Sequence, residues 1–284
     1  MNYQVISGTD IANNIYNTIN TNVSMSTKTP GLAIIMVGGK KESMTYVNIK
    51  KNKCKKYGLY CNLMELDDDV SDDAIILSIM ELNNDISVHG IIVQLPLPPY
   101  LNSRKILDSI LPEKDVDGLG TFNMGKLLSG DEPYFYPCTP EGCMSILNEH
   151  RVQIEGAHAV IIGCSNIVGK PMGIMLINKE ATVTMCHKKT ENIQQIVQMA
   201  DILIVACGVP ELVKGDWVKE GAFVIDVGIN YITDTTSSKG YRITGDVDFE
   251  EVSKKAHTTP VPGGVGPMTV STLLSHVTNA ARQC

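Results

Sequence analysis

The amino-acid sequence predicts an α/β fold with two domains. Short apolar runs, each bounded by glycine, proline or charged residues, alternate with polar stretches of helical length. This pattern is typical of buried parallel strands joined by helical crossovers. The runs fall into two series, separated by a segment rich in proline, glycine and acidic residues at 129–142. The 284 residues also exceed the roughly 100 to 200 of one domain, so we expect two cores with a ligand site between them.

The first series predicts three strands and the second predicts four. The expected strands are residues 31–39, 58–66 and 88–98, followed by residues 158–163, 181–187, 201–208 and 222–228. Residues 43–57 contain no glycine or proline and are expected to form a helix. Another helix is expected to begin near Thr139, whereas the polar stretch 233–240 is expected to be a loop.

The composition excludes several classes of protein. Lysine and arginine number 24 against 31 acidic residues, a net charge of −7, which argues against a general binder of nucleic acid or anionic membranes. The eight cysteines show no C-x-x-C spacing, which indicates a reducing compartment and no metal site. The N-terminus has no signal-peptide pattern, and no segment reaches about 18 consecutive apolar residues. We therefore expect a cytoplasmic protein with no membrane span.

Five lysines lie between Tyr46 and Tyr57 in the stretch SMTYVNIKKNKCKKYG, residues 43–58. On a helix, Ser43, Tyr46, Lys50 and Lys53 lie along one stripe. Because lysines usually lie in water, the stripe can be a solvated basic face with a packed tyrosine. Alternatively, Tyr46 and Lys50 form a catalytic pair in a cleft, where burial and the other lysines favour a neutral amine that can transfer protons. This helix alone leaves both interpretations open.

Two further polar positions lie where ligands bind in open α/β sheets, beyond the carboxyl ends of strands. Gln94 ends the apolar run of GIIVQLPLP, and an amide at that edge favours a ligand-facing role. Asp115 and Asp117 precede Gly118 in PEKDVDG, where aspartates can simply form a turn. A carboxylate there can also accept a paired N–H edge from a heterocycle.

The stretch VIIGCSNIVGKPMG, residues 160–173, follows an expected strand and opens an expected helix, as a dinucleotide-binding turn does. The G-x-G-x-x-G fingerprint is imperfect. Gly163 fits the first position, Ser165 and Val168 take the second and third, and Gly169 follows one residue later. The motif is weak on its own and gains weight from the strand that follows it.

Basic residues follow that second strand, where an NAD site normally offers a carboxylate to the ribose. His187, Lys188 and Lys189 stand there instead, and they attract the 2′-phosphate that a carboxylate would repel. The sequence therefore favours NADP over NAD, although lysines at this point can also form a solvated approach to a helix.

Three prolines and three glycines fall within residues 258–267. Such a segment is conformationally fixed, yet it lets backbone approach a ligand closely. A rigid connector would not require Gly263, Gly264 and Gly266 together. Pro267 suits the first turn of a last helix.

Together these residues resemble the family of bifunctional methylenetetrahydrofolate dehydrogenase/methenyltetrahydrofolate cyclohydrolases. The motifs that carry the resemblance are, in order, SMTYVNIKKNKC, GIIVQLPLP, PEKDVDG, GCSNIVGKPM and TPVPGGVGPMT. The resemblance implies NADP-dependent oxidation of 5,10-methylenetetrahydrofolate to 5,10-methenyltetrahydrofolate, and then hydrolysis to 10-formyltetrahydrofolate. It also implies a homodimer that serves one-carbon metabolism and purine biosynthesis. As a separate hypothesis, the lysine cluster at 50–56 binds the glutamate tails of polyglutamylated folates.

The resemblance further implies domain bounds and residue roles. It implies a folate-binding catalytic domain at 1–137, to which a last helix at 268–284 returns, and a Rossmann NADP-binding domain at 138–267. By the same resemblance, Lys50 is the catalytic lysine, Tyr46 packs on the folate, Gln94 is the partner of the lysine and Asp117 anchors the pterin. Further implied substrate contacts are Ser43, Gly263, Gly266 and Val270, and the implied cofactor contacts are Gly163, Cys164, Ser165, Val168, Gly169, His187, Lys188, Gly208, Ile229 and Thr269.

One residue departs from the family pattern, and two rival functions compete with the family assignment. Cys164 stands where many relatives carry an arginine that clamps the 2′-phosphate, so the NADP preference depends on Lys188 and its neighbours. A short-chain dehydrogenase also uses Tyr-x-x-x-Lys, but there the nucleotide loop precedes the pair, whereas here Tyr46 precedes Gly163. A folate or nucleotide sensor without turnover is the other rival, and the intact set of catalytic residues argues against it.

Overall fold

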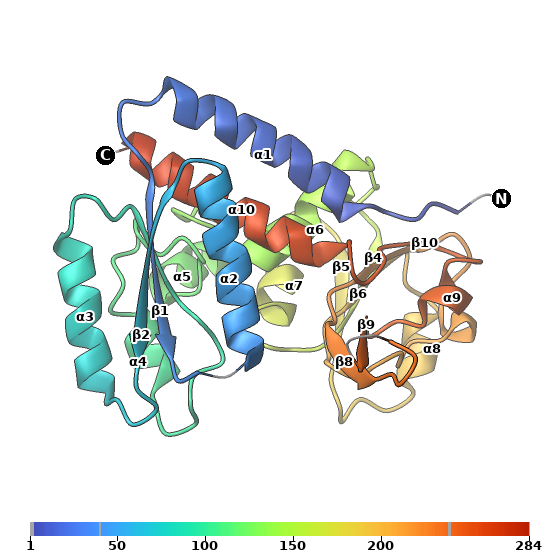
Figure 1. The fold of residues 1–284 in the computed structure, drawn as a ribbon. Helices are drawn as coiled ribbons and strands as arrows, with labels where there is room; N and C mark the ends of the chain where they lie inside the picture. The colour runs from blue at the N-terminus through green and yellow to red at the C-terminus, as the bar shows by residue number, and fades with distance from the viewer. Residues whose placement is uncertain (1–2, 40, 238–239, 284) are drawn as a thin grey trace. The chain divides into compact units, whose positions relative to one another are not determined.

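The computed structural model describes residues 3–39, 41–237 and 240–283. The chain divides into two compact units, each assembled from two stretches of sequence. The three-stranded unit comprises Asn13–Cys138 and Val270–Cys284, and the five-stranded unit comprises Met1–Ala12 and Thr139–Thr269. Each unit contains a parallel sheet with helices around it, as Figure 1 shows. The α/β prediction is therefore confirmed.

The three-stranded sheet has the order β2-β1-β3, and its strands are β1 Gly31–Val37, β2 Tyr60–Leu66 and β3 Gly90–Val93. All residues of β1 and β3 are buried, as the continuous apolar runs predict, whereas β2 forms a partly exposed edge. The expected strand at 88–98 is shorter than predicted. The chain leaves the sheet after Gln94, where prolines 96, 98 and 99 have no N–H to donate.

The helices of this unit include some whose ends are capped by the local sequence. They are α1 Gly8–Met25, α2 Lys41–Lys56, α3 Asp72–Asn84, α4 Ser103–Leu107, α5 Thr121–Ser129 and the greater part of α10 Val265–Gln283. The Ser71 hydroxyl caps α3 by accepting the N–H of Ala74 at 3.3 Å. Helix α5 ends at Gly130, whose φ of 76° suits glycine. The buried side chains of α3, Ile75, Ile79 and Leu82, recur at helical spacing and join the core with β1 and β3.

The five-stranded sheet has the order β10-β7-β6-β4-β5, with all strands parallel. Its strands are β4 His158–Ile162, β5 Thr182–Cys186, β6 Ile202–Val205, β7 Phe223–Asp226 and β10 His257–Thr258. Its helices are α6 Cys138–Glu149, α7 Gly169–Ile177, α8 Ile193–Val197, α9 Phe249–Val252 and the short 3-10 turn η1 Gly215–Trp217. From β4 the chain continues outward to β5 and then returns to β6 on the other side of β4. The strand order therefore reverses between β4 and β6, which makes this a doubly wound, Rossmann-like sheet.

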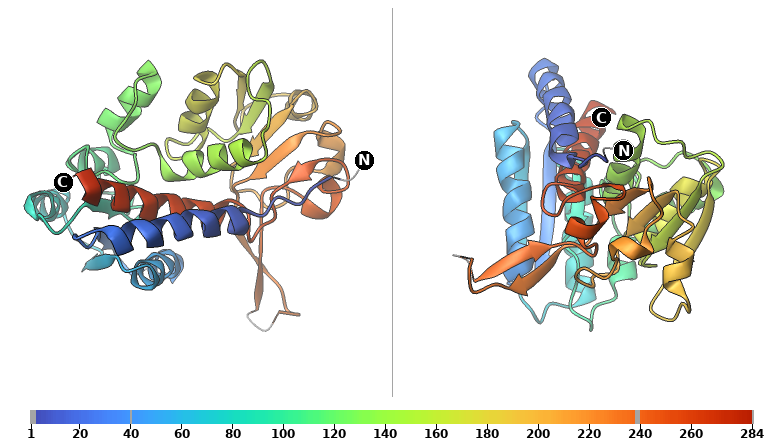
Figure 2. Two further views of the ribbon diagram at one scale, coloured as in Figure 1. Left: turned by 90° about the horizontal axis from the view of Figure 1, so that it is seen from above. Right: turned by 90° about the vertical axis from the view of Figure 1, so that its right-hand side faces the viewer.

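An antiparallel hairpin, β8 Asn230–Thr233 with β9 Tyr241–Thr244, follows β7 and was not predicted. Figure 2 shows it extending away from the five-stranded sheet. The stretch 233–240, expected to be a loop, connects these two strands; residues 238–239 lie outside the described residues. The N-terminal segment also contributes to this unit, because Val5 forms a parallel bridge with Thr258 beside β10.

Among the residues that the structure describes, none of the helices combines the length and apolar character that a membrane span requires. The cysteines at 54, 61, 138, 143, 164, 186 and 207 are free thiols, and most of them are buried or half-buried.

Candidate functional site

The side chains of Lys50 and Gln94 meet in the three-stranded unit. Lys50 Nζ donates a hydrogen bond to Gln94 Oε1 over 3.0 Å, and both side chains are half-buried. Gln94 is fixed at the end of β3, because its N–H donates to the carbonyl of Ile35 at 2.8 Å and its Nε2 donates to the carbonyl of Leu95 at 2.8 Å. The amide oxygen is thereby left to accept from the lysine, which holds the amine at the carboxyl end of the sheet.

Helix α2 presents the other predicted residues around that amine. Val47 and Cys54 are fully buried and pack the helix onto its unit. Ser43 and Tyr46 are half-buried on the flank that also carries Lys50, and Tyr46 lies one helical turn before the lysine. The structure therefore places Ser43, Tyr46 and Lys50 on a face that is neither core nor fully solvated.

The remaining lysines of α2 do not all lie in water, which the sequence did not indicate. Lys53 Nζ lies 4.4 Å from the centroid of the Tyr16 ring, and Tyr16 stacks on Tyr57 with centroids 4.5 Å apart. Lys56 Nζ lies 5.3 Å from the centroid of Tyr57. These cation–π contacts give the two lysines a structural role that is separate from that of Lys50.

The loop that carries Asp117 is organised by a buried carboxylate, Asp115. Its oxygens accept the N–H groups of Leu119 at 3.3 Å and Gly120 at 2.9 Å, and Nδ2 of Asn123 at 2.9 Å. Burial raises the pKa of Asp115 to about 6, although these hydrogen bonds act in the opposite direction. Asp115 is therefore the turn-forming residue that the sequence allowed.

Asp117 itself is half-buried, and its carbonyl accepts the N–H of Cys138 at 3.4 Å. Gly118 follows with a φ of 68°, and a Cβ at that position would lie 2.5 Å from the Tyr136 carbonyl carbon, so the backbone must pack closely here. Within the described part of the chain, the Asp117 carboxylate makes no hydrogen bond to another side chain or to backbone. It is thus a carboxylate on a hydrogen-bonded backbone that can still accept N–H donors.

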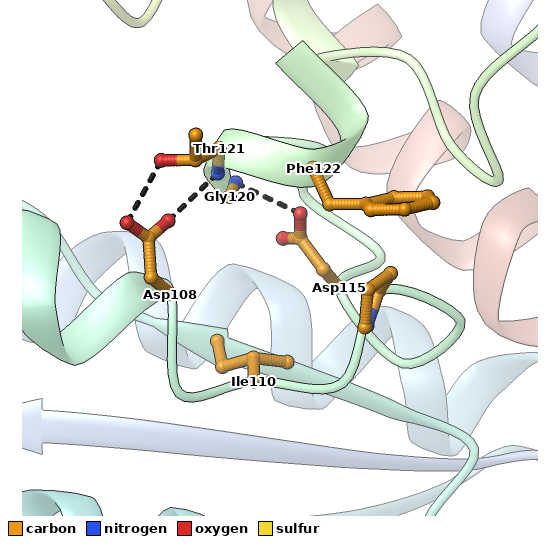
Figure 3. A pocket seen from close by; sticks show the side chains of 7 residues that line it. Asp108, Ile110, Asp115, Gly120, Thr121 and Phe122 are labelled. Carbon is orange, nitrogen blue, oxygen red and sulfur yellow. Dashed lines mark hydrogen bonds between the residues drawn. The ribbon is translucent and has the colours of Figure 1, made fainter. Parts of the chain in front are cut away.

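A pocket of about 260 Å³ beside this loop is not the predicted site. Figure 3 shows its two carboxylates already engaged, Asp115 with Gly120, and Asp108 with the N–H and hydroxyl of Thr121 at 2.7 and 2.8 Å. Its lining includes Phe122 but none of the predicted catalytic residues.

In the five-stranded unit, the nucleotide loop lies at the reversal of strand order. Gly163 follows β4 with a φ of 118°, and a Cβ there would overlap the carbonyl oxygen of Ala206, which follows β6. Gly169 begins α7, and a Cβ there would overlap the carbonyl oxygen of Gly163. The Ser165 hydroxyl accepts the N–H of Val168 at 3.1 Å and that of Gly169 at 3.5 Å. Although the fingerprint is imperfect, the loop has the glycine cradle and helix start of a dinucleotide site.

The basic residues that favour NADP lie at the same edge of this sheet. The carbonyl of Cys186, the last residue of β5, accepts the N–H of Gly163 at 2.9 Å, so the ends of β4 and β5 are adjacent. His187, Lys188 and Lys189 follow immediately and are exposed. The three residues form a turn, in which the N–H of Lys189 donates to His187 Nδ1 at 3.2 Å.

Three other predicted cofactor contacts lie on the loops at this edge. Cys164 is exposed after Gly163, Ile229 is 39% exposed after β7, and Gly208 follows β6 with a φ of 69°. The loop of Gly208 is held by Asp246, whose Oδ2 accepts the N–H groups of Cys207 at 2.7 Å and Gly208 at 2.8 Å.

The predicted residues around α10 divide between the two units. Gly263, with a φ of 109°, Gly266 and Thr269 belong to the five-stranded unit, whereas Val270 is buried in the three-stranded unit. The Thr269 and Thr139 hydroxyls hydrogen-bond at 3.0 Å, which joins the start of α10 to α6.

The sequence did not point to two buried aspartates, Asp226 and Asp246. Their carboxylates hold the loops at the carboxyl edge of the five-stranded sheet. The available signal was an aspartate that closes the apolar strand in FVIDVG and another in the turn of TGDVD. Nothing in the sequence indicated that these two segments meet.

Comparison with known proteins decides the family. A model described as the tetrahydrofolate dehydrogenase/cyclohydrolase catalytic domain matches residues 6–117, and one described as the NAD(P)-binding domain of the same enzymes matches residues 137–284. The chain belongs to the tetrahydrofolate dehydrogenase/cyclohydrolase family. This confirms the predicted resemblance and the prediction of an enzyme.

Several relatives match this chain over nearly its whole length. It is 43% identical over 284 residues to the bifunctional protein FolD of Geotalea uraniireducens, covering 99% of each chain. The crystal structure of the FolD enzyme from Campylobacter jejuni shares 42% identity with a TM-score of 0.94 over 99% of both chains. The Trypanosoma brucei FolD, crystallised with NADP cofactor and an inhibitor, shares 38% identity with a TM-score of 0.94, covering 99% of this chain and 98% of that one. The chain spans only 27% to 31% of the C-1-tetrahydrofolate synthases that it also matches.

Proposed function

We propose that this family member oxidises 5,10-methylenetetrahydrofolate with NADP and hydrolyses the resulting 5,10-methenyltetrahydrofolate to 10-formyltetrahydrofolate. The observation that carries the proposal is the hydrogen bond from Lys50 to Gln94. It holds an amine at the carboxyl end of β3, within the residues that match the catalytic domain of the family. The matching domains and the full-length FolD relatives support both half-reactions.

In the oxidation, the work of the protein is to hold the reactants in line. The two nitrogens that flank the methylene carbon stabilise the cation left when hydride departs, so positioning is most of that step. NADP, when bound, supplies the hydride acceptor. The glycine cradle of Gly163 and Gly169 fits a dinucleotide, since a Cβ at either position would fill the space where backbone approaches backbone.

In the hydrolysis, Lys50 moves protons. Water attacks the methenyl carbon, and the adduct collapses as the bond from that carbon to N5 breaks. Water gives up two protons in this sequence, of which one ends on N5 and the other in solvent. The Lys50 amine takes a proton from the attacking water and returns one to N5, while Gln94 keeps the amine oriented.

The remaining predicted residues complete the folate site in this proposal. Tyr46 packs on the folate ring, with Ser43 one turn before it on α2. Asp117 accepts the paired N–H groups of the pterin, which its fixed backbone and accessible carboxylate support. Gly263, Gly266 and Val270 line the substrate.

The proposed cofactor contacts are the predicted residues on the loops around the reversal of strand order, together with Thr269. Lys188 and His187 attract the 2′-phosphate, and their exposure at the end of β5, beside the β4 loop, supports that role. Backbone at Gly163, Ser165, Val168 and Gly169 cradles the phosphates, and Cys164, Gly208 and Ile229 lie on the neighbouring loops.

The proposal extends to a cytoplasmic homodimer that supplies purine biosynthesis and accepts polyglutamylated folates. The lysine-rich helix α2 supports the last part, since glutamate tails are anionic. The predicted division into a folate domain at 1–137 with 268–284 and an NADP domain at 138–267 is also part of the proposal. It differs from the two compact units chiefly at residues 1–12, which group with the five-stranded unit.

Spectrophotometric turnover tests the function directly. Purified protein with 5,10-methylenetetrahydrofolate and NADP should form NADPH, and with 5,10-methenyltetrahydrofolate alone it should speed the loss of methenyl absorbance. Binding of both ligands without either turnover would instead favour the sensor interpretation.

A further inference from the structure

Asp246 is a fully buried carboxylate, 0% exposed, whose oxygens join separate segments of the five-stranded unit. Its Oδ2 accepts the N–H groups of Cys207 and Gly208, in the loop after β6. Its Oδ1 accepts Nδ2 of Asn230, the first residue of β8, at 2.8 Å. One side chain thus fixes two successive peptide groups and the start of the hairpin.

A second buried carboxylate, Asp226 at the end of β7, fixes the segment that carries Asp246. Asp226 Oδ1 accepts the N–H groups of Gly228 at 2.9 Å and Asp246 at 3.0 Å, and its Oδ2 accepts that of Val247 at 2.9 Å. A Cβ at Gly245 would overlap the Asp226 carboxylate. The glycine is therefore what allows this close approach.

The peptide groups that Asp246 holds lie at the place where this fold binds dinucleotides. The loop after β6 faces the loop after β4, since a Cβ at Gly163 would overlap the carbonyl oxygen of Ala206. The strand order reverses between these same two strands, and in open α/β sheets the ligand lies outside the carboxyl ends of the strands at that reversal.

A loop that is already ordered binds a ligand better than one that must be ordered on binding, because the entropy cost has been met in the free protein. Gly208 has a φ of 69°, in the left-handed region, and glycine is the residue with the most freedom to leave such a conformation. The charge-assisted hydrogen bonds to Asp246 Oδ2 are what restrain it.

We propose that Asp246 is a positioning residue for NADP, which holds the Cys207–Gly208 loop in its binding conformation, and that Asp226 in turn holds Asp246. This inference deepens the proposed function and rests on it. Neither carboxylate contacts the reacting atoms, so the expected effect is on cofactor affinity and not on the hydrolytic step.

The test is Asp246→Asn, compared with Asp248→Asn. At position 246 the amide replaces one acceptor oxygen with a donor, so either Asn230 or the loop N–H groups lose their partner. Asp248 is a matched control two residues away, because it pairs with Lys214 at 3.0 Å and caps α9, away from this loop. We expect Asp246→Asn to raise the KM for NADP and the Kd from NADPH fluorescence titration by about tenfold or more, as for loss of hydrogen bonds to a charged group.

Cyclohydrolase activity on added methenyltetrahydrofolate provides the internal comparison, because it needs no hydride acceptor. We expect it to change less than about twofold in Asp246→Asn, whereas general damage to the protein would lower both activities. An unchanged KM and Kd for the cofactor, or an equal fall in both activities, would overturn the inference. A wild-type protein that binds NADPH but turns over neither folate would instead refute the proposed function.

Asp226→Asn provides a second variant if Asp246→Asn does not fold. Burial raises the pKa of Asp226 to about 7, so a neutral amide resembles a form that the folded protein already tolerates. The amide loses one of the acceptors that hold the 246–247 backbone, and we expect a rise of about threefold in the KM for NADP with unchanged cyclohydrolase activity. An unaltered KM would count against the positioning role.

Discussion

At the scale of single residues, the lysines of α2 have distinct environments. Lys50 is bound to the side-chain oxygen of Gln94, whereas Lys53 and Lys56 lie against the rings of Tyr16 and Tyr57. The sequence predicted the partnership of Lys50 with Gln94 only through a family resemblance. It could not predict the contact with Tyr16, because that ring comes from a helix more than thirty residues away.

Asp117→Asn should abolish tight folate binding. The amide offers a donor where the carboxylate accepts a pair of N–H groups, so one bond is replaced by a donor–donor contact. We expect folate affinity to fall by about 100-fold, measured by isothermal titration calorimetry. Asp69→Asn, an exposed aspartate of the same unit, is the control and should bind normally. Equal affinity in the two variants would rule out Asp117 as the anchor.

Lys188→Ala should weaken NADP more than NAD. The lost ammonium group no longer faces the 2′-phosphate, which NAD lacks, so we expect kcat/KM with NADP to fall about tenfold and kcat/KM with NAD to change little. Steady-state kinetics with both cofactors check this, and Lys179→Ala, exposed just before β5, provides the control. A parallel loss with both cofactors would show that Lys188 does not read the phosphate.

At the scale of elements, the strands that the sequence predicted are those with continuous apolar runs. Strands β1, β4, β6 and β7 are almost completely buried, so pattern and burial coincide. The hairpin β8–β9 escaped prediction because its strands have only four residues each, mostly exposed or half-buried, and resemble a polar loop. Strand β10 has only two residues and is recognised by its backbone pairing with β7 and with Val5.

The buried carboxyl group of Asp115 should make the free energy of unfolding depend on pH. Burial raises the pKa of Asp115 from 3.8 to about 6 in the folded protein. Folding therefore favours the neutral acid. The stabilisation that protonated Asp115 gives the folded protein is fully present below pH 3.8 and is lost as the pH rises through about 6. The loss is about 3 kcal/mol for a shift of this size.

Asp115→Asn removes that titration. Calorimetric unfolding from about pH 4 to about pH 7 should therefore show a smaller fall in stability with rising pH in Asp115→Asn than in the wild type or in Asp69→Asn. If all three proteins showed the same pH dependence, Asp115 would not be the group responsible.

At the scale of the whole molecule, neither compact unit is a continuous stretch of sequence. Helix α1 begins in the five-stranded unit and continues in the three-stranded unit, and α10 does the same. The apolar runs predicted two cores, because each series forms its own sheet. They could not predict which unit the first twelve residues join, since that depends on backbone pairing between Val5 and Thr258.

The central claim for the whole enzyme is a division of labour, in which Lys50 transfers protons for hydrolysis while oxidation depends on positioning. The decisive measurement is the ratio of the two activities in Lys50→Met, with Lys55→Met on the exposed side of α2 as the control. We predict a loss of cyclohydrolase activity of about 100-fold to 10,000-fold with a part of the dehydrogenase activity retained. Equal residual activity in both half-reactions would contradict the account.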